Sequence, residues 1–166
     1  MITYTSTLDT PIGPFTIIVD RDGAVLASGW TASTADLLPH IHADLRADPV
    51  TKDDLGAATR AAAAYHRGDL AAPSVVPVRQ QAGGTFLTVA WKALRDVAPG
   101  ERVTYTELAS RAGNPAAVRA AAQACARNAA ALFVPCHRVI RTDGGLGGFR
   151  WGLAAKQWLL AHESRS

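Results

Sequence analysis

Short stretches of β-branched residues separated by turn residues open the chain. Residues 2–8 and 14–19 are rich in Thr, Ile and Val, and Thr10-Pro11-Ile12-Gly13-Pro14 between them is typical of a turn. This pattern predicts a β-hairpin. Asp22-Gly23 predicts a second turn, and residues 24–30 predict a third strand that follows it.

Two helices and a break are predicted next. Residues 34–47 and 54–67 favour helices, and Gly68 is placed to end the second one. Residues 71–78 are interrupted by two prolines and favour an extended conformation, which makes them the best candidate for a linker. We therefore expect a small α/β domain over residues 1–80, linker included, and a second domain over residues 81–166.

The pattern of the second domain is helical. Residues 85–97 place Phe86, Val89, Ala90 and Leu94 on one face of a helix, and Pro99-Gly100 should stop it. This periodicity predicts a helix packed on one side only.

Two further helices are predicted around a glycine turn. Thr104-Tyr105-Thr106-Glu107 has the spacing of a capping box, so a helix should begin there and run to about residue 112. Gly113-Asn114-Pro115 then suits a helix end, a new N-cap and a first helical position, which predicts a second helix over 115–127. Helix, glycine-containing turn and helix form a helix-turn-helix.

The second of these helices is unusually small in its side chains. Seven of its residues are Ala, and Arg119 is the only long side chain before Gln123. A helix that reads the major groove carries several long polar side chains, whereas this one can approach a narrow surface and insert one cation. Close packing between helices also uses Ala, so both interpretations stay open at this point.

Composition and charge narrow the function classes. The chain is 48% hydrophobic and 19% charged, and it has no apolar run long enough for a membrane span. The N-terminal residues lack a secretory pattern, so we expect a cytoplasmic protein without a membrane association. Residues 1–81 carry 6 Lys/Arg and 9 Asp/Glu, which gives a net charge of −3. Residues 82–166 carry 11 Lys/Arg and 5 Asp/Glu, which gives a net charge of +6. The basic half favours a polyanionic partner.

The cysteines and histidines argue against metal or disulfide chemistry. Cys125 and Cys136 are too few for a disulfide framework, and the five His residues show no metal-ligand spacing with them. We expect no metal site. Cys125 lies inside the Ala-rich helix, where a small apolar residue packs well.

Cys136 is the candidate nucleophile. A thiol is strongly nucleophilic only as thiolate, and a neighbouring His or a positive field lowers its pKa. Arg127, Arg138 and Arg141 make the surroundings basic, which we expect to favour the thiolate. Neighbours on a strand point to opposite faces, so a turn after the preceding proline or a bridging water must connect Cys136 with His137. A Cys-His dipeptide alone is more often inert and buried.

The hexapeptide Pro135-Cys136-His137-Arg138-Val139-Ile140 resembles the active-site signature of the O6-alkylguanine-DNA alkyltransferases. The surrounding segments resemble other parts of that family. Residues 100–105 and 108–109 resemble its start of the helix-turn-helix, and residues 113–119 and 127–128 resemble its recognition helix and hinge. Residues 144–152 and 156–163 resemble its active-site loop and its last helix. The resemblance is strong over residues 84–163 and looser over 1–80. It implies an α+β, mainly helical fold, with a small ribonuclease H-like α/β domain and a C-terminal helix-turn-helix domain.

The resemblance also implies an activity. The chain would reverse DNA damage directly, by irreversible transfer of an alkyl group, chiefly methyl, from O6-alkylguanine to Cys136. O4-alkylthymine would be a further candidate substrate. Each molecule would act once, as a monomer on the minor groove of double-stranded DNA, with low sequence specificity, no cofactor and no metal. The damaged nucleotide must be rotated out of the stack to reach a thiol in the protein.

Individual roles follow from the resemblance. His137 would take the proton of Cys136 through a water, and Glu163 would orient His137, in the manner of the hydrolytic triads. Tyr105 would protonate the departing guanine, and Asn128 would hold the hinge. Arg119 would fill the gap that the rotated nucleotide leaves in the stack. The other residues expected to contact DNA are Tyr105, Ala120 and Arg127. The pocket for the flipped base falls on Val139, Phe149, Arg150 and Trp151.

One departure concerns the pocket, and three alternatives concern the function. Phe149-Arg150-Trp151-Gly152 is bulkier than in the human member of the family, which predicts a tight pocket that accepts methyl and resists benzyl groups. A non-catalytic damage sensor would carry Trp in place of Cys136. A cysteine hydrolase would turn over repeatedly. A transcription regulator would use the helix-turn-helix on one operator.

Overall fold

The computed structural model describes residues 1–164, which divide into two compact units. The first comprises residues 1–81 together with residues 129–133, and the second comprises residues 82–128 and the chain from Val134 onward. The sequence assigned residues 129–133 to the second domain. They belong to the first unit because Ser28 exchanges backbone hydrogen bonds with them, and its hydroxyl donates to Ala131 O at 2.7 Å.

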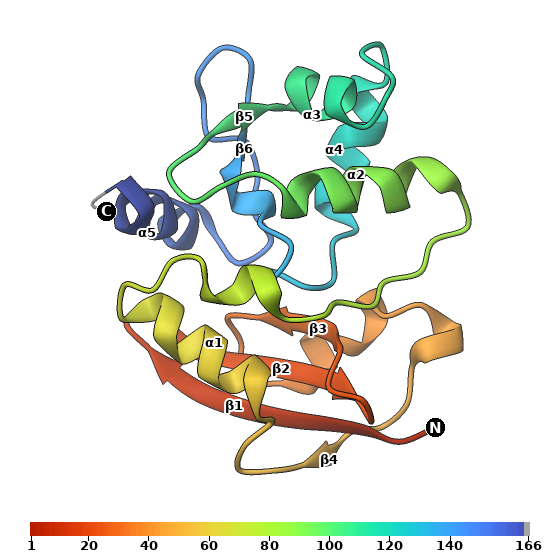
Figure 1. The fold of residues 1–166 in the computed structure, drawn as a ribbon, viewed down its shortest axis with the longest axis vertical. Helices are drawn as coiled ribbons and strands as arrows, with labels where there is room; N and C mark the ends of the chain where they lie inside the picture. The colour runs from red at the N-terminus through yellow and green to blue at the C-terminus, as the bar shows by residue number, and fades with distance from the viewer. Residues whose placement is uncertain (165–166) are drawn as a thin grey trace. The chain divides into compact units, whose positions relative to one another are not determined.

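A four-stranded sheet forms the base of the first unit (Figure 1). Strands β1 (Thr3–Thr10) and β2 (Gly13–Asp20) pair antiparallel, which confirms the predicted hairpin. Strand β3 (Val25–Gly29) pairs antiparallel with β2, and the two-residue β4 (Val50–Thr51) pairs parallel with β1. The order is β3-β2-β1-β4. β2 is buried from Phe15 to its end, so it forms the centre of this core.

Helix α1 (Ala57–His66) packs on β1 and β2, and Figure 1 shows it lying across one face of the sheet. The sequence placed its start at residue 54. Instead Asp54 forms a turn in which its carboxylate accepts the Gly56 N–H, and the helix begins only after Gly56. Gly68 has a φ of +114°, as a helix-ending glycine requires.

Two expectations about the first unit are wrong. Residues 34–47 form three short 3-10 turns, η1 (Thr34–Asp36), η2 (Leu38–His40) and η3 (Ala43–Leu45), instead of one helix. Pro39 lies in the middle, and proline lacks the N–H that a continuous helix needs and clashes with the preceding turn. Residues 71–78 are not a linker. They form η4 (Ala72–Val75) and then pair with β3, where Val25 N donates to Pro77 O at 2.8 Å.

Three helices pack together in the second unit: α2 (Thr85–Arg95), α3 (Tyr105–Arg111) and α4 (Val118–Ala126). Their packing is visible in the green and teal part of Figure 1. The buried face of α2 includes Leu94 as predicted, but Val89 is 42% exposed, so its place in the predicted core is wrong.

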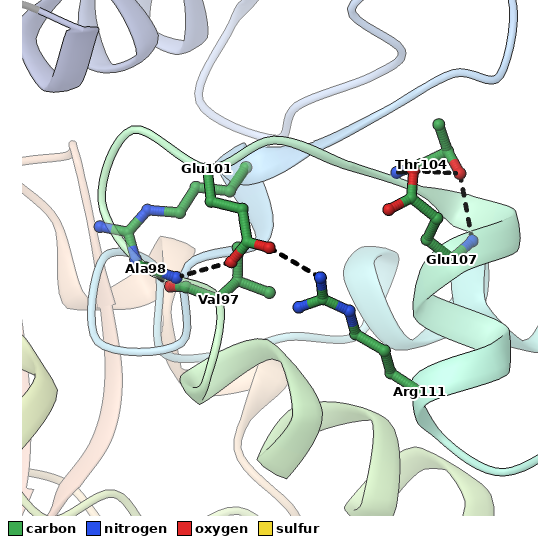
Figure 2. A network of polar contacts seen from close by, with 7 residues as sticks. Val97, Ala98, Glu101, Thr104, Glu107 and Arg111 are labelled. Atoms are coloured by element: carbon green, nitrogen blue, oxygen red, sulfur yellow. Dashed lines mark hydrogen bonds and ion pairs between the residues drawn. The ribbon is translucent and has the colours of Figure 1, made fainter.

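Local signals explain how α3 begins and why α4 begins late. Figure 2 shows the predicted capping box, in which Thr104 Oγ1 accepts the Glu107 N–H at 3.1 Å and the Glu107 carboxylate accepts the Thr104 N–H. Gly113 then turns the chain with a φ of +93°. The sequence placed the next helix start at residue 115. Asn114 instead closes a turn with its side chain on Ala116 N, so α4 begins at Val118.

The rest of the second unit frames the candidate site. Strands β5 (Val103–Thr104) and β6 (Val139–Ile140) pair parallel, and α5 (Leu153–Ser164) closes the described chain. Between β6 and α5 lies the glycine-rich loop, residues 141–152. Among residues 1–164, none of the helices has the length and apolar character needed to cross a membrane.

Candidate active site

Cys136 and His137 lie on one 3-10 turn, η5 (Cys136–Arg138), which follows Pro135. Cys136 N donates to Val134 O at 2.8 Å, and Arg138 N donates to Pro135 O at 3.1 Å. The chain therefore turns after the proline, which is one of the two connections that the sequence left open. The turn leaves Cys136 partly exposed while it buries His137 and Arg138.

A buried carboxylate holds both of the residues that follow the thiol. Glu163 Oε2 lies 2.7 Å from His137 Nε2, and its two oxygens also accept from Arg138 Nε at 2.7 Å and Nη2 at 2.9 Å. The third nitrogen of Arg138 donates to Val97 O at 2.7 Å. His137 is 0% and Glu163 1% exposed, so this is a desolvated network in which both oxygens of Glu163 take part in hydrogen bonds.

The network fixes the protonation of the imidazole. Burial alone would raise the pKa of Glu163, but the hydrogen bonds from His137 and Arg138 outweigh it and hold that pKa well below its usual range. Burial lowers the pKa of His137, although Glu163 opposes the shift. The imidazole is thus neutral at neutral pH, with the Nε2 proton pointed at the carboxylate. Its Nδ1 is buried and has no hydrogen-bond partner among the described residues, so it presents a basic lone pair.

The expected thiolate-favouring field is corrected by the structure. Enclosure of the sulfur raises the pKa of Cys136, and the groups that counteract this are Asn128, Lys156 and Arg150 rather than the arginines named from the sequence. Enclosure wins because removing a charge from water costs more than distant cations return. The thiol is therefore neutral at rest, and it needs a base to become a nucleophile.

Asn128 joins the hinge after α4 to the thiol. Its side chain is buried, donates to Val134 O at 2.8 Å and also hydrogen-bonds Cys136. Val134 O also accepts the Cys136 N–H, so the Asn128 amide holds the same carbonyl that holds the backbone of the nucleophile.

Lys156 is the residue that sequence reasoning missed. Its side chain is fully buried, and Nζ donates to Val139 O at 2.8 Å, to Leu146 O at 2.5 Å and to Gly148 O at 3.4 Å. It therefore ties the glycine-rich loop to β6. A signal was present: the inward face of α5 repeats every three or four residues and includes Lys156 and Glu163 at positions where apolar residues are expected.

Tyr105 and Gly147 meet at the edge of the same loop. Tyr105 is the first residue of α3, and burial, with a smaller contribution from the nearby Cys125 and Cys136, raises its pKa to about 12, so its hydroxyl keeps its proton. A Cβ at Gly147 would lie 2.9 Å from the Tyr105 hydroxyl, and this glycine has a φ of +74°. Glycine is thus required there, both for backbone conformation and for space.

The other predicted residues fall into two groups. Arg119 and Ala120 are near the start of α4, about two helical turns before Arg127, and both arginines are exposed. Val139 is buried in β6, and the glycine-rich loop carries Phe149, Arg150 and Trp151. Arg150 reaches across to Asn128 O at 2.8 Å, so the loop contacts the hinge directly.

The chemistry that this arrangement permits is proton removal followed by nucleophilic attack. The thiol is neutral, the imidazole has an available lone pair, and a carboxylate is buried behind the imidazole. These three groups have the arrangement of a nucleophile, a base and a group that orients the base. Tyr105 adds a protonated hydroxyl beside the loop. Within the described residues, no three His, Cys, Asp or Glu side chains gather as they would around a metal ion.

Comparison with known proteins places this site in context. Residues 85–165 match the family described as "6-O-methylguanine DNA methyltransferase, DNA binding domain". The bifunctional transcriptional activator/DNA repair enzyme Ada of Escherichia coli is 49% identical over 84 residues, which are 51% of this chain and 24% of Ada. The chain thus spans about a quarter of that relative.

Two other relatives are matched along nearly their whole length. The methylated-DNA–protein-cysteine methyltransferase of Salmonella typhimurium is 34% identical over 93% of this chain and 91% of its own. The crystal structure of Mycobacterium tuberculosis OGT in complex with DNA matches with a TM-score of 0.79 at 29% identity, covering 98% of this chain and 93% of that one. Because the Salmonella typhimurium relative is 34% identical over more than nine tenths of both chains, this chain belongs to the methylated-DNA–protein-cysteine methyltransferase family.

Proposed function

We propose that this protein repairs alkylated DNA by moving the alkyl group, chiefly methyl, from O6-alkylguanine to its own Cys136. The observation that carries the proposal is the buried Glu163–His137 pair, which presents an unprotonated Nδ1 on the same turn as the thiol. A cysteine with a raised pKa has no use for such a base unless its proton must be removed.

The reaction balances without any other reagent. The Cys136 proton passes through a water to His137 Nδ1, and the sulfur attacks the alkyl carbon as that carbon's bond to O6 breaks. Tyr105 gives its hydroxyl proton to the departing guanine, and the proton held by His137 returns to the phenolate. The products are a thioether and an ordinary guanine. Water does not hydrolyse a thioether, so each molecule acts once.

The burial of the network suits this chemistry. Protonating His137 places a second cation beside the Glu163 carboxylate, which Arg138 already pairs, and Glu163 stabilises the imidazolium at 2.7 Å. Arg138 keeps Glu163 ionised before and after the transfer. The thiol is neutral at rest and becomes charged only when a base removes its proton, which limits its reaction with other electrophiles.

Access to the base requires that DNA be held and the nucleotide be rotated out. We propose that α3 and α4 act as a helix-turn-helix with the small Ala-rich face of α4 in the minor groove and Ala120 at the contact. Arg119 enters the stack and offsets part of the few kcal/mol that flipping costs. Arg127 and Tyr105 contact the backbone nearby. One long side chain on this face gives low sequence specificity.

The glycine-rich loop receives the flipped base in this proposal. Val139 and the loop residues Phe149, Arg150 and Trp151 line the pocket, and Lys156 fixes the loop from behind through Leu146 O and Gly148 O. O4-alkylthymine presents the same exocyclic O-alkyl group and is proposed as a second substrate. The order and direction of the strands in the first unit, with β1 and β4 parallel, support a ribonuclease H-like fold for it. We propose a monomer that works in the cytoplasm, without cofactor or metal.

Mass spectrometry tests the proposal directly. The protein is incubated with a duplex that contains one O6-methylguanine, and intact protein and peptides are weighed. We expect one added methyl group, on the peptide that contains Cys136. Cys136→Ala should abolish it. Cys125→Ala is the matched control, because burial raises the pKa of that thiol as well, yet it lies inside α4 and should leave the methyl transfer intact.

Each rival function gives a different result. A damage sensor binds the duplex and leaves the mass of both partners unchanged. A cysteine hydrolase converts many substrate molecules per protein molecule and ends without a stable adduct. A transcription regulator protects one operator and ignores the lesion. Any of these results, obtained with folded protein, overturns the proposal.

A further inference from the structure

Arg150 connects the glycine-rich loop to the end of α4. Its Nη1 donates to Asn128 O at 2.8 Å, and its Nη2 donates to Ala126 O. Ala126 is the last residue of α4, and Asn128 is two residues beyond it. A single side chain from one loop thus grips two carbonyls of another segment at once.

At the C-terminal end of α4, each of the last four backbone carbonyls accepts a hydrogen bond. The last four carbonyls of a helix have no partner within it. In α4 the carbonyls of residues 123 and 125 accept from the backbone just after the helix, and Ala124 O accepts from Trp91 Nε1 at 2.9 Å. Arg150 completes the set at Ala126 O. A guanidinium at a helix C-terminus also interacts favourably with the helix dipole.

Asn128 extends the connection to the nucleophile. Arg150 donates to its backbone oxygen, while its side chain donates to Val134 O at 2.8 Å, and the same Val134 O accepts the Cys136 N–H at 2.8 Å. Arg150, Asn128 and Cys136 therefore form a continuous chain of contacts that runs from the loop to the thiol. The positive charge of Arg150 also favours the thiolate form of Cys136.

We propose that Arg150 is a positioning residue that latches the glycine-rich loop to the C-terminal end of α4, so that the loop and the thiol adopt the reactive arrangement together when α4 is on DNA. This rests on the proposed function, because it assigns α4 to the DNA and the loop to the flipped base. The latch adds a second task to a residue otherwise assigned only to the pocket wall.

The geometry explains why the residue is arginine. The two carbonyls are held by two different nitrogens of one planar group, whereas the three N–H donors of a lysine all radiate from one nitrogen and cannot reproduce this spread geometry. Arg150→Lys therefore keeps the charge near the sulfur and loses the two-point grip. Arg150→Ala loses both. The pair separates the electrostatic effect of Arg150 from its mechanical one.

The test compares two reactions of Cys136 in wild type, Arg150→Lys, Arg150→Ala and the control Arg21→Ala, which removes a charge from an exposed turn of the first unit. The first is single-turnover methyl transfer from a saturating O6-methylguanine duplex. The second is alkylation by iodoacetamide as a function of pH, which needs no loop or helix. Thermal unfolding of each variant is measured in parallel.

We expect both Arg150 variants to transfer methyl about 10- to 100-fold more slowly at saturating duplex, because small misplacements of reacting groups cost this much. The iodoacetamide profile should stay unchanged in Arg150→Lys and move to higher pH in Arg150→Ala, and the Arg21 control should match wild type in both reactions. Methyl transfer at the wild-type rate by Arg150→Lys overturns the latch. A wild-type protein that transfers no methyl overturns the proposed function instead, so the two failures are distinguishable.

Discussion

Arg138→Met is the substitution that most sharply tests the buried network behind the thiol. Arg138 is 6% exposed and donates two hydrogen bonds to Glu163 and one to Val97 O. Methionine has a comparable length and fills much of the same space without charge or donors. The variant therefore leaves Glu163 buried with His137 as its partner and leaves Val97 O without this donor.

The size of the effect follows from burial. Removing one partner of a buried ion pair costs about 3–5 kcal/mol, because the remaining charge stays desolvated. In a chain of this length each kcal/mol lowers the Tm by roughly 2–4 °C, so the expected fall is about 6–20 °C. A surface ion pair such as Arg111–Glu101, whose side chains are 37% and 38% exposed and which Figure 2 shows between α3 and the preceding loop, should cost less than about 1 kcal/mol when Arg111 is changed to Ala.

The variant should also become sensitive to acid. In the wild type the lowered pKa of Glu163 means that its ionised form stabilises the fold above the ordinary carboxylate pKa, and this stability is lost only as pH falls through the lowered value. Without Arg138, burial raises the pKa of Glu163 again, so protonation occurs at a higher pH. Methyl transfer should slow in parallel, because a protonated Glu163 no longer stabilises the imidazolium.

Thermal unfolding from pH 4 to 8 and single-turnover methyl transfer measure both effects. Arg138→Lys, which keeps the charge but not the fork, should fall between wild type and Arg138→Met. Adding Glu163→Leu to Arg138→Met should recover part of the Tm but none of the activity, since the buried charge is then gone. An Arg138→Met protein with the Tm and the transfer rate of wild type would refute the reasoning.

Three further outcomes are expected. Burial holds the pKa of His137 below its ordinary 6.5, so the unfolded chain takes up a proton before the folded one does, and stability should fall as pH drops below about 6.5. The transfer rate should fall only at lower pH, where the imidazole of the folded protein is itself protonated. His137→Gln should flatten the stability profile below pH 6.5. Gly147→Ala should slow methyl transfer by displacing Tyr105. The control is Gly144→Ala: Gly144 has a similarly positive φ of +88° and a Cβ there would meet no atom within 4 Å, so this variant should lose only about 1–2 kcal/mol of stability and keep its transfer rate. Equal transfer rates for the two variants would show that displacing Tyr105 does not affect the reaction. The bulky loop should react with methylated guanine far faster than with O6-benzylguanine, and Trp151→Gly should narrow the gap; inactivation of the wild type by both at one rate would contradict the tight pocket.

Elements fixed by neighbouring residues could be predicted from the sequence. The first hairpin, the Thr104–Glu107 capping box and the glycine turn at Gly113 each depend on residues within a few positions of one another. The candidate nucleophile Cys136 and base His137 could also be predicted, because both lie within one hexapeptide. Errors arose where local preference competes with packing, as at residues 34–47, where Pro39 breaks the helix, and at residues 71–78, where pairing with β3 wins.

The candidate site was predictable in its members and not in its connections. Glu163 lies 26 residues after His137 and 25 after Arg138, and Arg138 lies 41 residues after Val97, so no local pattern shows that these groups meet. Lys156 gave a local hint as a cation on an apolar helix face, but only packing shows that its three partners are carbonyls of β6 and the loop.

The sequence by itself determined the residues available for chemistry and the secondary structure around them, because side-chain identity, turn preference and helix capping act over a few residues. The tertiary structure decided the protonation states. It encloses the sulfur of Cys136, which raises the pKa of the thiol against the basic sequence around it, and it places Glu163 where His137 must keep an accepting nitrogen. The physical reason is that a pKa depends on the solvent a group has lost and on the charges it has met, and both are set by residues far away in the chain.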